Sequence, residues 1–123
     1  MKIILAIIPP NRLHKLLDDL DERHLPGLTV SVATGFGQHD RNFTDVELTS
    51  KVRAEVVCHD EDVEGILDAI YQSLHTGRSG DGKIFVLPVL DAIRIKTGER
   101  GDAALGPAKT GGGPGTGKDG YSS

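Results

Sequence analysis

The sequence contains very little cysteine and few aromatic residues. Its 123 residues include one Cys, no Trp, two Tyr and three Phe. A single cysteine excludes a disulfide framework or a multi-thiolate metal site within one chain, and it suits the reducing cytoplasm. Cys58 ends an apolar stretch, so we expect it to be a small buried hydrophobe. The scarcity of aromatic rings argues against a stacking platform for single-stranded nucleic acid.

The sequence also lacks an excess of positive charge and a long hydrophobic run. The formal net charge is -4, whereas a sequence-independent nucleic-acid binder needs a basic face for phosphate contacts. The apolar run over residues 3–8 is too short to cross a bilayer, and the cleavage region of a signal peptide does not follow it. These absences predict a soluble cytoplasmic protein without a nucleic-acid partner.

Residues 106–123 are rich in glycine and proline and cannot bury enough apolar surface to offset chain entropy. We therefore expect one domain over residues 1–105 and a disordered tail over residues 106–123. Within the tail, residues 112–118 match the GxxxxGK pattern of a phosphate-binding loop. We reject this match because no apolar strand precedes it and Asp119 stands where a Ser or Thr is needed.

Hydrophobic periodicity divides the domain into strands and helices. Alternating or continuous apolar residues predict strands over residues 2–8, 28–33, 51–59 and 84–89, with a short fifth strand over residues 92–96. Apolar residues at helical spacing predict a helix of about 12 residues from Asn11 and a second one ending near His75. For the second helix, Asp60 is the expected N-cap and Gly77 the expected C-cap. Residues 38–50 are polar and predict an exposed loop.

This order of elements indicates an α+β, ferredoxin-like βαββαβ sandwich. In that fold, two helices cover one face of an antiparallel sheet. The opposite face would then leave apolar residues of several strands in water, which is costly. Oligomerisation is the simplest remedy, and we expect it.

A glycine-rich turn at residues 76–83 runs into the strand at residues 84–89. Its glycines allow positive φ angles and close backbone approach, and Lys83 adds a cation, so the turn could cradle phosphates. Arg94 and Lys96 add two cations at i and i+2, which would share one face of an extended segment. The alternative is a solvated hairpin turn with surface charges.

Other polar residues give weaker signals. The five histidines lack the HxxxH or HExxH spacing of a metal site, so we expect solvated or capping roles for them and no metal. His39 is the exception to watch, because it adjoins the turn at residues 35–37 and could respond to pH or to an anion. The acidic residues 60–64 suit a helix start better than a cation site. Phe43 and Val46 could either pack back on the domain or contact a partner.

Several separated stretches, in this order and spacing, resemble the PII family of signal-transduction proteins. The resemblance spans residues 1–105. It lies in residues 6–8 with Pro10 and Leu13, then 27–30, 35–37 and 51–52, and most specifically in Thr-Gly-x-x-Gly-Asp-Gly-Lys-Ile-Phe-Val at 76–86 joined to Ile-Arg-Ile-Lys-Thr-Gly-Glu at 93–99. This resemblance favours a phosphate-binding role for the glycine-rich turn.

The resemblance implies a homotrimer with adenine nucleotide sites in the clefts between subunits. It places Ile7 and Val57 near the adenine, and Gly27, Leu28 and Thr29 against the base and ribose from the adjoining chain. The phosphates would lie among two turns and two cations: Gly35, Phe36, Gly37 and Gln38; Gly80, Asp81, Gly82 and Lys83; Arg94 and Lys96. Lys96 stands where the family commonly has arginine, which keeps the charge but loses the bidentate fork.

The largest departure from the family is the loop over residues 38–50, which corresponds to the T-loop that reaches target proteins. It is shorter and contains no tyrosine, so nucleotidylation of a tyrosine is excluded there. Gln38-His39 replaces the usual Arg-Gln pair, which would favour ADP or AMP over ATP with Mg²⁺. In the family, the glutamine of that pair and the lysine matched by Lys51 hold 2-oxoglutarate. Gln38, His39 and Lys51 are therefore candidates for binding a second effector.

These observations predict a non-catalytic regulator that binds ADP, AMP or ATP and controls a transporter or enzyme through the short loop. A role in inorganic carbon control, with bicarbonate as effector and a link to carboxysomes, is one interpretation. Alternatives are a standard nitrogen regulator sensing 2-oxoglutarate and a trimeric adaptor indifferent to nucleotide. A slow Mg²⁺-dependent phosphohydrolase is a further alternative, although only Asp81 and Glu99 offer nearby carboxylates.

Overall fold

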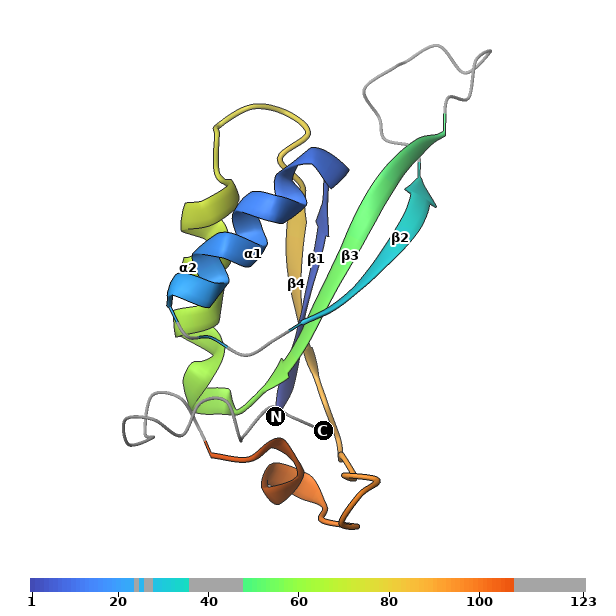
Figure 1. The fold of residues 1–123 in the computed structure, drawn as a ribbon, viewed down its shortest axis with the longest axis vertical. Coiled ribbons are helices and arrows are strands. Elements are labelled where there is room, and N and C mark those ends of the chain that lie inside the picture. The colour runs from blue at the N-terminus through green and yellow to red at the C-terminus, as the bar shows by residue number, and fades with distance from the viewer. Residues whose placement is uncertain (24, 26–27, 36–47, 108–123) are drawn as a thin grey trace.

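A computed structural model describes residues 1–23, 25, 28–35 and 48–107. Four strands, β1 (Lys2–Ile8), β2 (Thr29–Gly35), β3 (Thr49–Cys58) and β4 (Lys83–Pro88), form one sheet in the order β2-β3-β1-β4. Every neighbouring pair is antiparallel. The helices α1 (Leu13–Glu22) and α2 (Val63–Leu74) cover one face of this sheet (Figure 1). The predicted ferredoxin-like α+β fold is confirmed.

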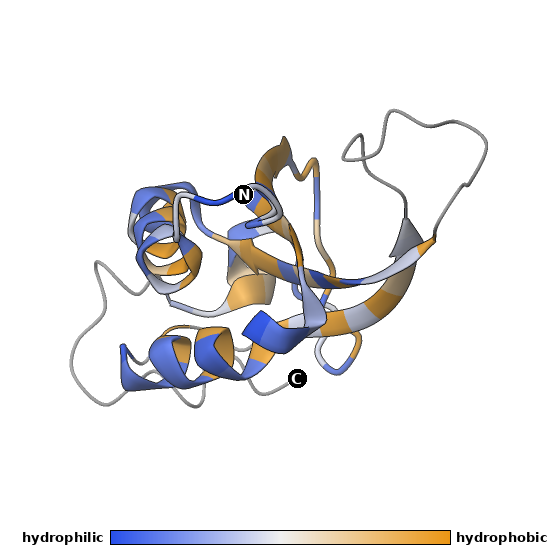
Figure 2. Ribbon diagram, turned by 90° about the horizontal axis from the view of Figure 1, so that it is seen from above, coloured by the Kyte–Doolittle hydropathy of each residue, from blue (hydrophilic) through white to orange (hydrophobic). Residues whose placement is uncertain are grey.

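The core lies between the helices and the sheet, and strand alternation builds it. On β1, Ile4, Ala6 and Ile8 are buried, while the residues between them point to the opposite face. Hydrophobic stretches of both helices face the sheet (Figure 2). The cluster is completed by Leu16, Leu20, Val52, Ala54, Val56, Cys58, Ile66, Ala69, Ile70 and Leu74. Cys58 is 1% exposed, so its predicted burial is confirmed.

Among the described residues, no helix covers the opposite face of the sheet, which we call the outer face. The register places Leu5 beside Phe85, and Ile3 beside Leu87 and Val57. Phe85 is 46% exposed and Leu87 is 42% exposed, so a single chain leaves this apolar strip in contact with water. The predicted bare face is present, and burying it in an oligomer would be favourable.

The ends of the helices differ from the prediction. The chain enters each helix through a short 3-10 turn, Pro10–Arg12 before α1 and Asp60–Asp62 before α2. Asp60 is therefore not the N-cap of α2. Its carboxylate instead binds the Met1 amino group at 3.0 Å and the Lys2 amino group at 3.1 Å. The C-cap of α2 is His75 in an extended conformation, rather than Gly77.

The predicted fifth strand is wrong. Residues 92–96 contribute one isolated bridge, between Ile93 and Arg100, and the chain then forms a 3-10 helix at Gly101–Leu105. A turn over residues 95–97 breaks the extended segment. Strand β3 begins at Thr49, which is earlier than predicted, so the loop over residues 38–50 ends sooner. The expected disordered tail lies outside the described residues beyond position 107.

Candidate functional site

The glycine loop, residues 75–83 between α2 and β4, is closed by its own side chains. The Asp81 carboxylate accepts hydrogen bonds from the backbone N–H of Thr76 at 2.9 Å and of Gly77 at 3.1 Å. It also accepts one from the Thr76 hydroxyl. These bonds, led by that of the Thr76 hydroxyl, lower the pKa of Asp81 and keep it ionised. The carboxylate therefore holds the loop closed across its base.

Gly82 places the loop directly against the end of β1. Its φ is +107°, and a Cβ there would lie 2.2 Å from the Ile7 carbonyl oxygen. Only glycine permits both the conformation and this approach. The next residue, Lys83, pairs with Ile7 in the sheet, so the two side chains share the outer face. Gly82 thus places the Lys83 cation on the same sheet face as Ile7, the residue predicted to contact adenine.

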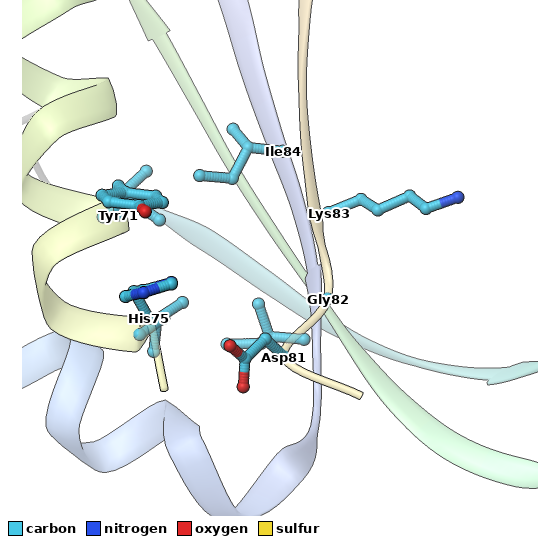
Figure 3. A pocket seen from close by; sticks show the side chains of 9 residues that line it. Tyr71, His75, Asp81, Gly82, Lys83 and Ile84 are labelled. Atoms are coloured by element: carbon cyan, nitrogen blue, oxygen red, sulfur yellow. The ribbon is translucent and has the colours of Figure 1, made fainter. Parts of the chain in front are cut away.

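A cavity of about 230 Å³ lies on the other side of β4, between α2 and the glycine loop. Its lining is Ile8, Ile70, Tyr71, Leu74, His75, Asp81, Gly82, Lys83 and Ile84. Tyr71 and His75 stack at its rim with ring centroids 4.8 Å apart. Figure 3 shows Ile84 directed into the cavity and the Lys83 side chain directed away from it. The predicted phosphate contact of Lys83 therefore belongs to the outer face and not to this cavity.

Part of the predicted site gathers at one end of the sheet, which we call the loop end. Here β1 and β2 finish and β3 and β4 begin (Figure 1). Ile7 pairs with Lys83 on one side and Arg53 on the other, and Lys51 lies two positions from Arg53. Gly35 lies farther out, because it pairs with Thr49, four positions from Arg53. The Thr49 hydroxyl donates to the Gly35 carbonyl at 3.1 Å, which ties the end of β2 to the start of β3.

Arg53 adds a further cation at this end that the sequence analysis missed. It pairs with Ile7 across β1 and β3 and lies 2.9 Å from the Glu55 carboxylate. The alternation of residues 51–59 could have indicated that Arg53 and Lys51 share a face.

Arg94 and Lys96 follow β4 at the opposite end of the sheet, which we call the terminus end because the N-terminus lies there. Thr29, the first residue of β2, pairs with Glu55, which pairs with Leu5 in the middle of β1, so Leu28 and Thr29 lie between the two ends. Strand β4 has six residues and therefore separates Lys83 from Arg94 by roughly 20 Å or more. A single chain cannot bring these two cations to one phosphate group.

Ile7 and Val57 also lie apart, which changes the predicted adenine contacts. Both are on the outer face, but Ile7 pairs with Arg53, whereas Val57 pairs with Ile3. Four strand positions separate them, or roughly 13 Å. Because Ile3 is the second residue of β1, its partner Val57 lies toward the terminus end. If both residues contact one adenine, they must come from different subunits.

Arg94 and Lys96 do not share the face of a strand, contrary to the prediction. The Gly98 N–H donates to the Arg94 carbonyl at 2.7 Å, and the Arg94 N–H donates to the Glu99 carbonyl at 2.9 Å, which closes a tight turn. The Arg94 Nε donates to the Ala104 carbonyl at 3.3 Å, and its Nη1 lies 3.9 Å from the Glu99 carboxylate. Arg94 is thus fixed, while Lys96 is exposed in the turn.

Sequence reasoning missed two residues that organise this turn. The Asp91 carboxylate accepts bonds from the Ala92 N–H at 2.8 Å, the Gly101 N–H at 3.1 Å and the Arg100 Nε at 3.0 Å. His59, expected to be solvated or capping, is instead buried at 7% exposure. It is the N-cap residue of the 3-10 turn Asp60–Asp62, but its side chain makes no capping hydrogen bond there. No local motif marks either residue, because Asp91 binds Arg100 and Gly101 across an irregular turn and the partner of His59 lies 47 positions away.

Five of the predicted binding residues lie outside the described part of the chain: Gly27, Phe36, Gly37, Gln38 and His39. Phe43 and Val46 also lie outside it. Across the residues that the structure does describe, no group of three or more His, Cys, Asp and Glu side chains could hold a metal ion. Within those same residues, no helix is both long and apolar enough to span a bilayer.

The fold and this geometry define a ferredoxin-like subunit with an uncovered sheet face and two separated groups of predicted ligand-binding residues. A model of the family described as Nitrogen regulatory protein P-II matches residues 1–99. The chain is 44% identical over 113 residues to the nitrogen regulatory protein P-II of Azospirillum brasilense, covering 85% of this chain and 100% of that protein. It therefore belongs to the P-II family of signal-transduction proteins.

Two further relatives support this assignment. The nitrogen regulatory protein GlnK2 of Haloferax mediterranei is 38% identical over 112 residues, covering 85% of this chain and 91% of that protein. The crystal structure of Arabidopsis thaliana PII bound to citrate has a TM-score of 0.71 and 39% identity, covering 84% of this chain and 90% of that chain. The predicted family is confirmed, and a trimer fits it.

Proposed function

We propose that this chain is a trimeric regulator that binds an adenine nucleotide between subunits and controls a transporter or enzyme through residues 38–50. One observation carries the proposal: the predicted ligand-binding residues of a single chain are divided between two ends of the sheet. A site containing both Lys83 and Arg94 therefore needs the loop end of one subunit and the terminus end of another. The uncovered outer face supplies the apolar surface for such an assembly.

The chemistry of the two ends suits a nucleotide. The loop end offers Lys83, the backbone of three positive-φ glycines and the apolar Ile7 side chain. The terminus end offers Arg94, Lys96 and Val57. Cations on both sides suit a phosphate chain, and apolar side chains suit a base. ADP or AMP, or ATP with Mg²⁺, is the proposed ligand class.

A small anion is the proposed second effector. Lys51 lies on the outer face at the loop end, close to where the loop over residues 36–47 joins the sheet. Bicarbonate and 2-oxoglutarate are the two anions to compare, and they correspond to roles in inorganic carbon and in nitrogen regulation. The named relatives are nitrogen regulators, and the Arabidopsis structure holds citrate, a carboxylate anion. The target protein is to be found among transporters and enzymes.

Mixing two variants tests whether the site is shared between subunits. Lys83→Ala removes the cation of the loop end, and Arg94→Ala removes the cation of the terminus end. Each homotrimer should bind ADP at least about tenfold more weakly than the unchanged protein in calorimetry, because one charge-assisted contact is lost at every site. After joint refolding, each mixed trimer keeps one intact interface, so a class of tight sites should reappear.

Lys15→Ala serves as the matched control, because Lys15 lies on α1 and pairs with Asp19 at 2.9 Å. It should bind ADP normally. If ATP, ADP and AMP all fail to bind at millimolar concentration, the proposal is wrong. If mixing restores no tight sites, the nucleotide does not bridge subunits. Steady phosphate release from ATP would favour the hydrolase alternative instead.

A further inference from the structure

His59 is a buried histidine that connects two distant parts of the chain. It follows Cys58, the last residue of β3, and its Nε2 lies 2.5 Å from the Gly106 carbonyl oxygen. Because a carbonyl only accepts hydrogen bonds, Nε2 carries a proton and donates it to this bond. The other ring nitrogen, Nδ1, lies 3.8 Å from the Asp102 carboxylate. Both partners belong to the chain that follows β4.

That following chain, residues 89–107, is here called the C-terminal segment. It is tied to the body of the protein at both ends. The Val89 N–H donates to the Met1 carbonyl at 3.1 Å near its start, and His59 holds Gly106 near its finish. Between these ties lie the turn with Arg94 and Lys96 and the 3-10 helix Gly101–Leu105. The placement of that turn therefore depends on both ties.

A chain of contacts leads from His59 to Arg94. His59 holds Gly106, which caps the 3-10 helix Gly101–Leu105. Within that helix, the Ala104 carbonyl accepts the hydrogen bond from the Arg94 Nε at 3.3 Å. Release of Gly106 would free the carbonyl that orients the guanidinium. We propose that His59 is a positioning residue for the phosphate-binding cation Arg94, and that its protonation strengthens nucleotide binding. This inference rests on the proposed function.

The direction of the pH effect follows from the two ring nitrogens. The bond from Nε2 to Gly106 is available to both the neutral and the charged imidazole. Protonation adds a second N–H at Nδ1, which faces the Asp102 carboxylate and gives the ring a positive charge. The charged ring therefore holds the C-terminal segment at two points, whereas the neutral ring holds it at one.

The other ionisable groups around His59 do not oppose the stronger hold on the C-terminal segment that we expect from the protonated ring. Asp60, the next residue, is paired with the Met1 amino group and with Lys2. Asp62 is buried at the start of α2, and Cys58 precedes the ring. Burial raises the pKa of the Cys58 thiol, which stays neutral. The nearby cations, the Met1 amino group and Lys2, therefore already have an acidic partner.

The pH dependence of ADP affinity tests the proposal on the full chain. His59→Gln can still donate one hydrogen bond but does not titrate. His14→Gln is the matched control, because His14 is exposed on α1. Calorimetry at pH 5.5 and 7.5 spans the ordinary histidine range around 6.5. Relative to His59→Gln, the unchanged protein should gain about threefold in affinity at the lower pH. The titration of ADP itself is common to all three proteins and cancels in this comparison. His14→Gln should follow the unchanged protein, which shows that the effect is specific to His59.

Limited trypsin cleavage provides a readout that needs no nucleotide. Arg94, Lys96 and Arg100 lie in the C-terminal segment, and His59→Ala should speed cleavage after them several-fold while the helices stay intact. Equal pH dependence in the unchanged protein and His59→Gln would overturn the inference, as would equal cleavage of the unchanged protein and His59→Ala. If no nucleotide binds while His59→Ala still accelerates cleavage, His59 does hold the C-terminal segment in place, but the proposed function is wrong.

Discussion

The two ends of β4 are held in different ways. At the loop end, Asp81 binds Thr76 and Gly77, only a few residues away, and Gly82 packs on the strand end at Ile7. At the terminus end, the C-terminal segment depends on His59, which is 47 positions from its partner Gly106. The hydrogen bonds of Asp81 lie within one contiguous motif. The contact of Gly82 with Ile7 and the bond of His59 with Gly106 exist only once the sheet has formed. Because the bonds of Asp81 are local and the bond of His59 is not, the two ends should respond differently to substitution.

The largest expected effect is that of Gly82→Ala at the loop end. A Cβ would meet the Ile7 carbonyl oxygen at 2.2 Å in a backbone conformation that alanine rarely adopts. We expect a loss of about 3 kcal/mol in the free energy of unfolding, measured by urea denaturation. ADP binding should be lost as well, because Lys83 would be displaced from the outer face.

Gly80→Ala is the control for this substitution. Gly80 also has a positive φ, +94°, but nothing lies within 4 Å of its Cβ position. Only the backbone strain should remain, at about 1 kcal/mol. Equal losses for the two variants would mean that the contact with Ile7 does not fix the loop.

This contrast explains what could be predicted from the sequence. Alternation and helical spacing indicated the strands and helices, and the short motif around Gly82 indicated the loop, since each signal is local. The predicted N-cap role of Asp60 is wrong because its carboxylate binds the Met1 amino group. Burial of His59 and the turn around Arg94 depend on Gly106, Ala104 and Asp91. No spacing rule relates those positions, so the terminus end could not be assembled from the sequence.

Asp91→Asn should produce an intermediate effect, confined to the terminus end. Asp91 pairs with Arg100 and accepts two backbone N–H bonds, and these contacts, led by that of Arg100, lower its pKa. The amide keeps one acceptor oxygen but loses the charge. We expect trypsin to cleave after Arg94 or Arg100 several-fold faster, with little change in urea denaturation of the sheet. Asp18→Asn on α1 is the control, and faster cleavage in that variant too would show that the effect is not specific.

The smallest effect should come from Asp81, and pH reveals it. Because the folded pKa of Asp81 is lowered, mainly by the Thr76 hydroxyl, its contribution to stability is fully present above the ordinary aspartate value of about 3.9. The contribution is lost as the pH falls through the lower folded value. In Asp81→Asn, this stabilising contribution should be absent at every pH, so the loop end should show no acid-range dependence. The acid-range dependence that Asp91 gives the terminus end should remain.

Amide hydrogen exchange at Thr76 and Gly77 measures this directly, since Asp81 accepts both N–H groups. In the unchanged protein, their protection beyond the intrinsic pH dependence of exchange should persist through the ordinary aspartate value of about 3.9 and fall only at lower pH. In Asp81→Asn, protection should be low and should show no such step. A step at the ordinary aspartate value would mean that these bonds do not persist in solution. The loop would then be held by the contact between Gly82 and Ile7 alone, and the two ends of β4 would differ less than the hydrogen bonds indicate.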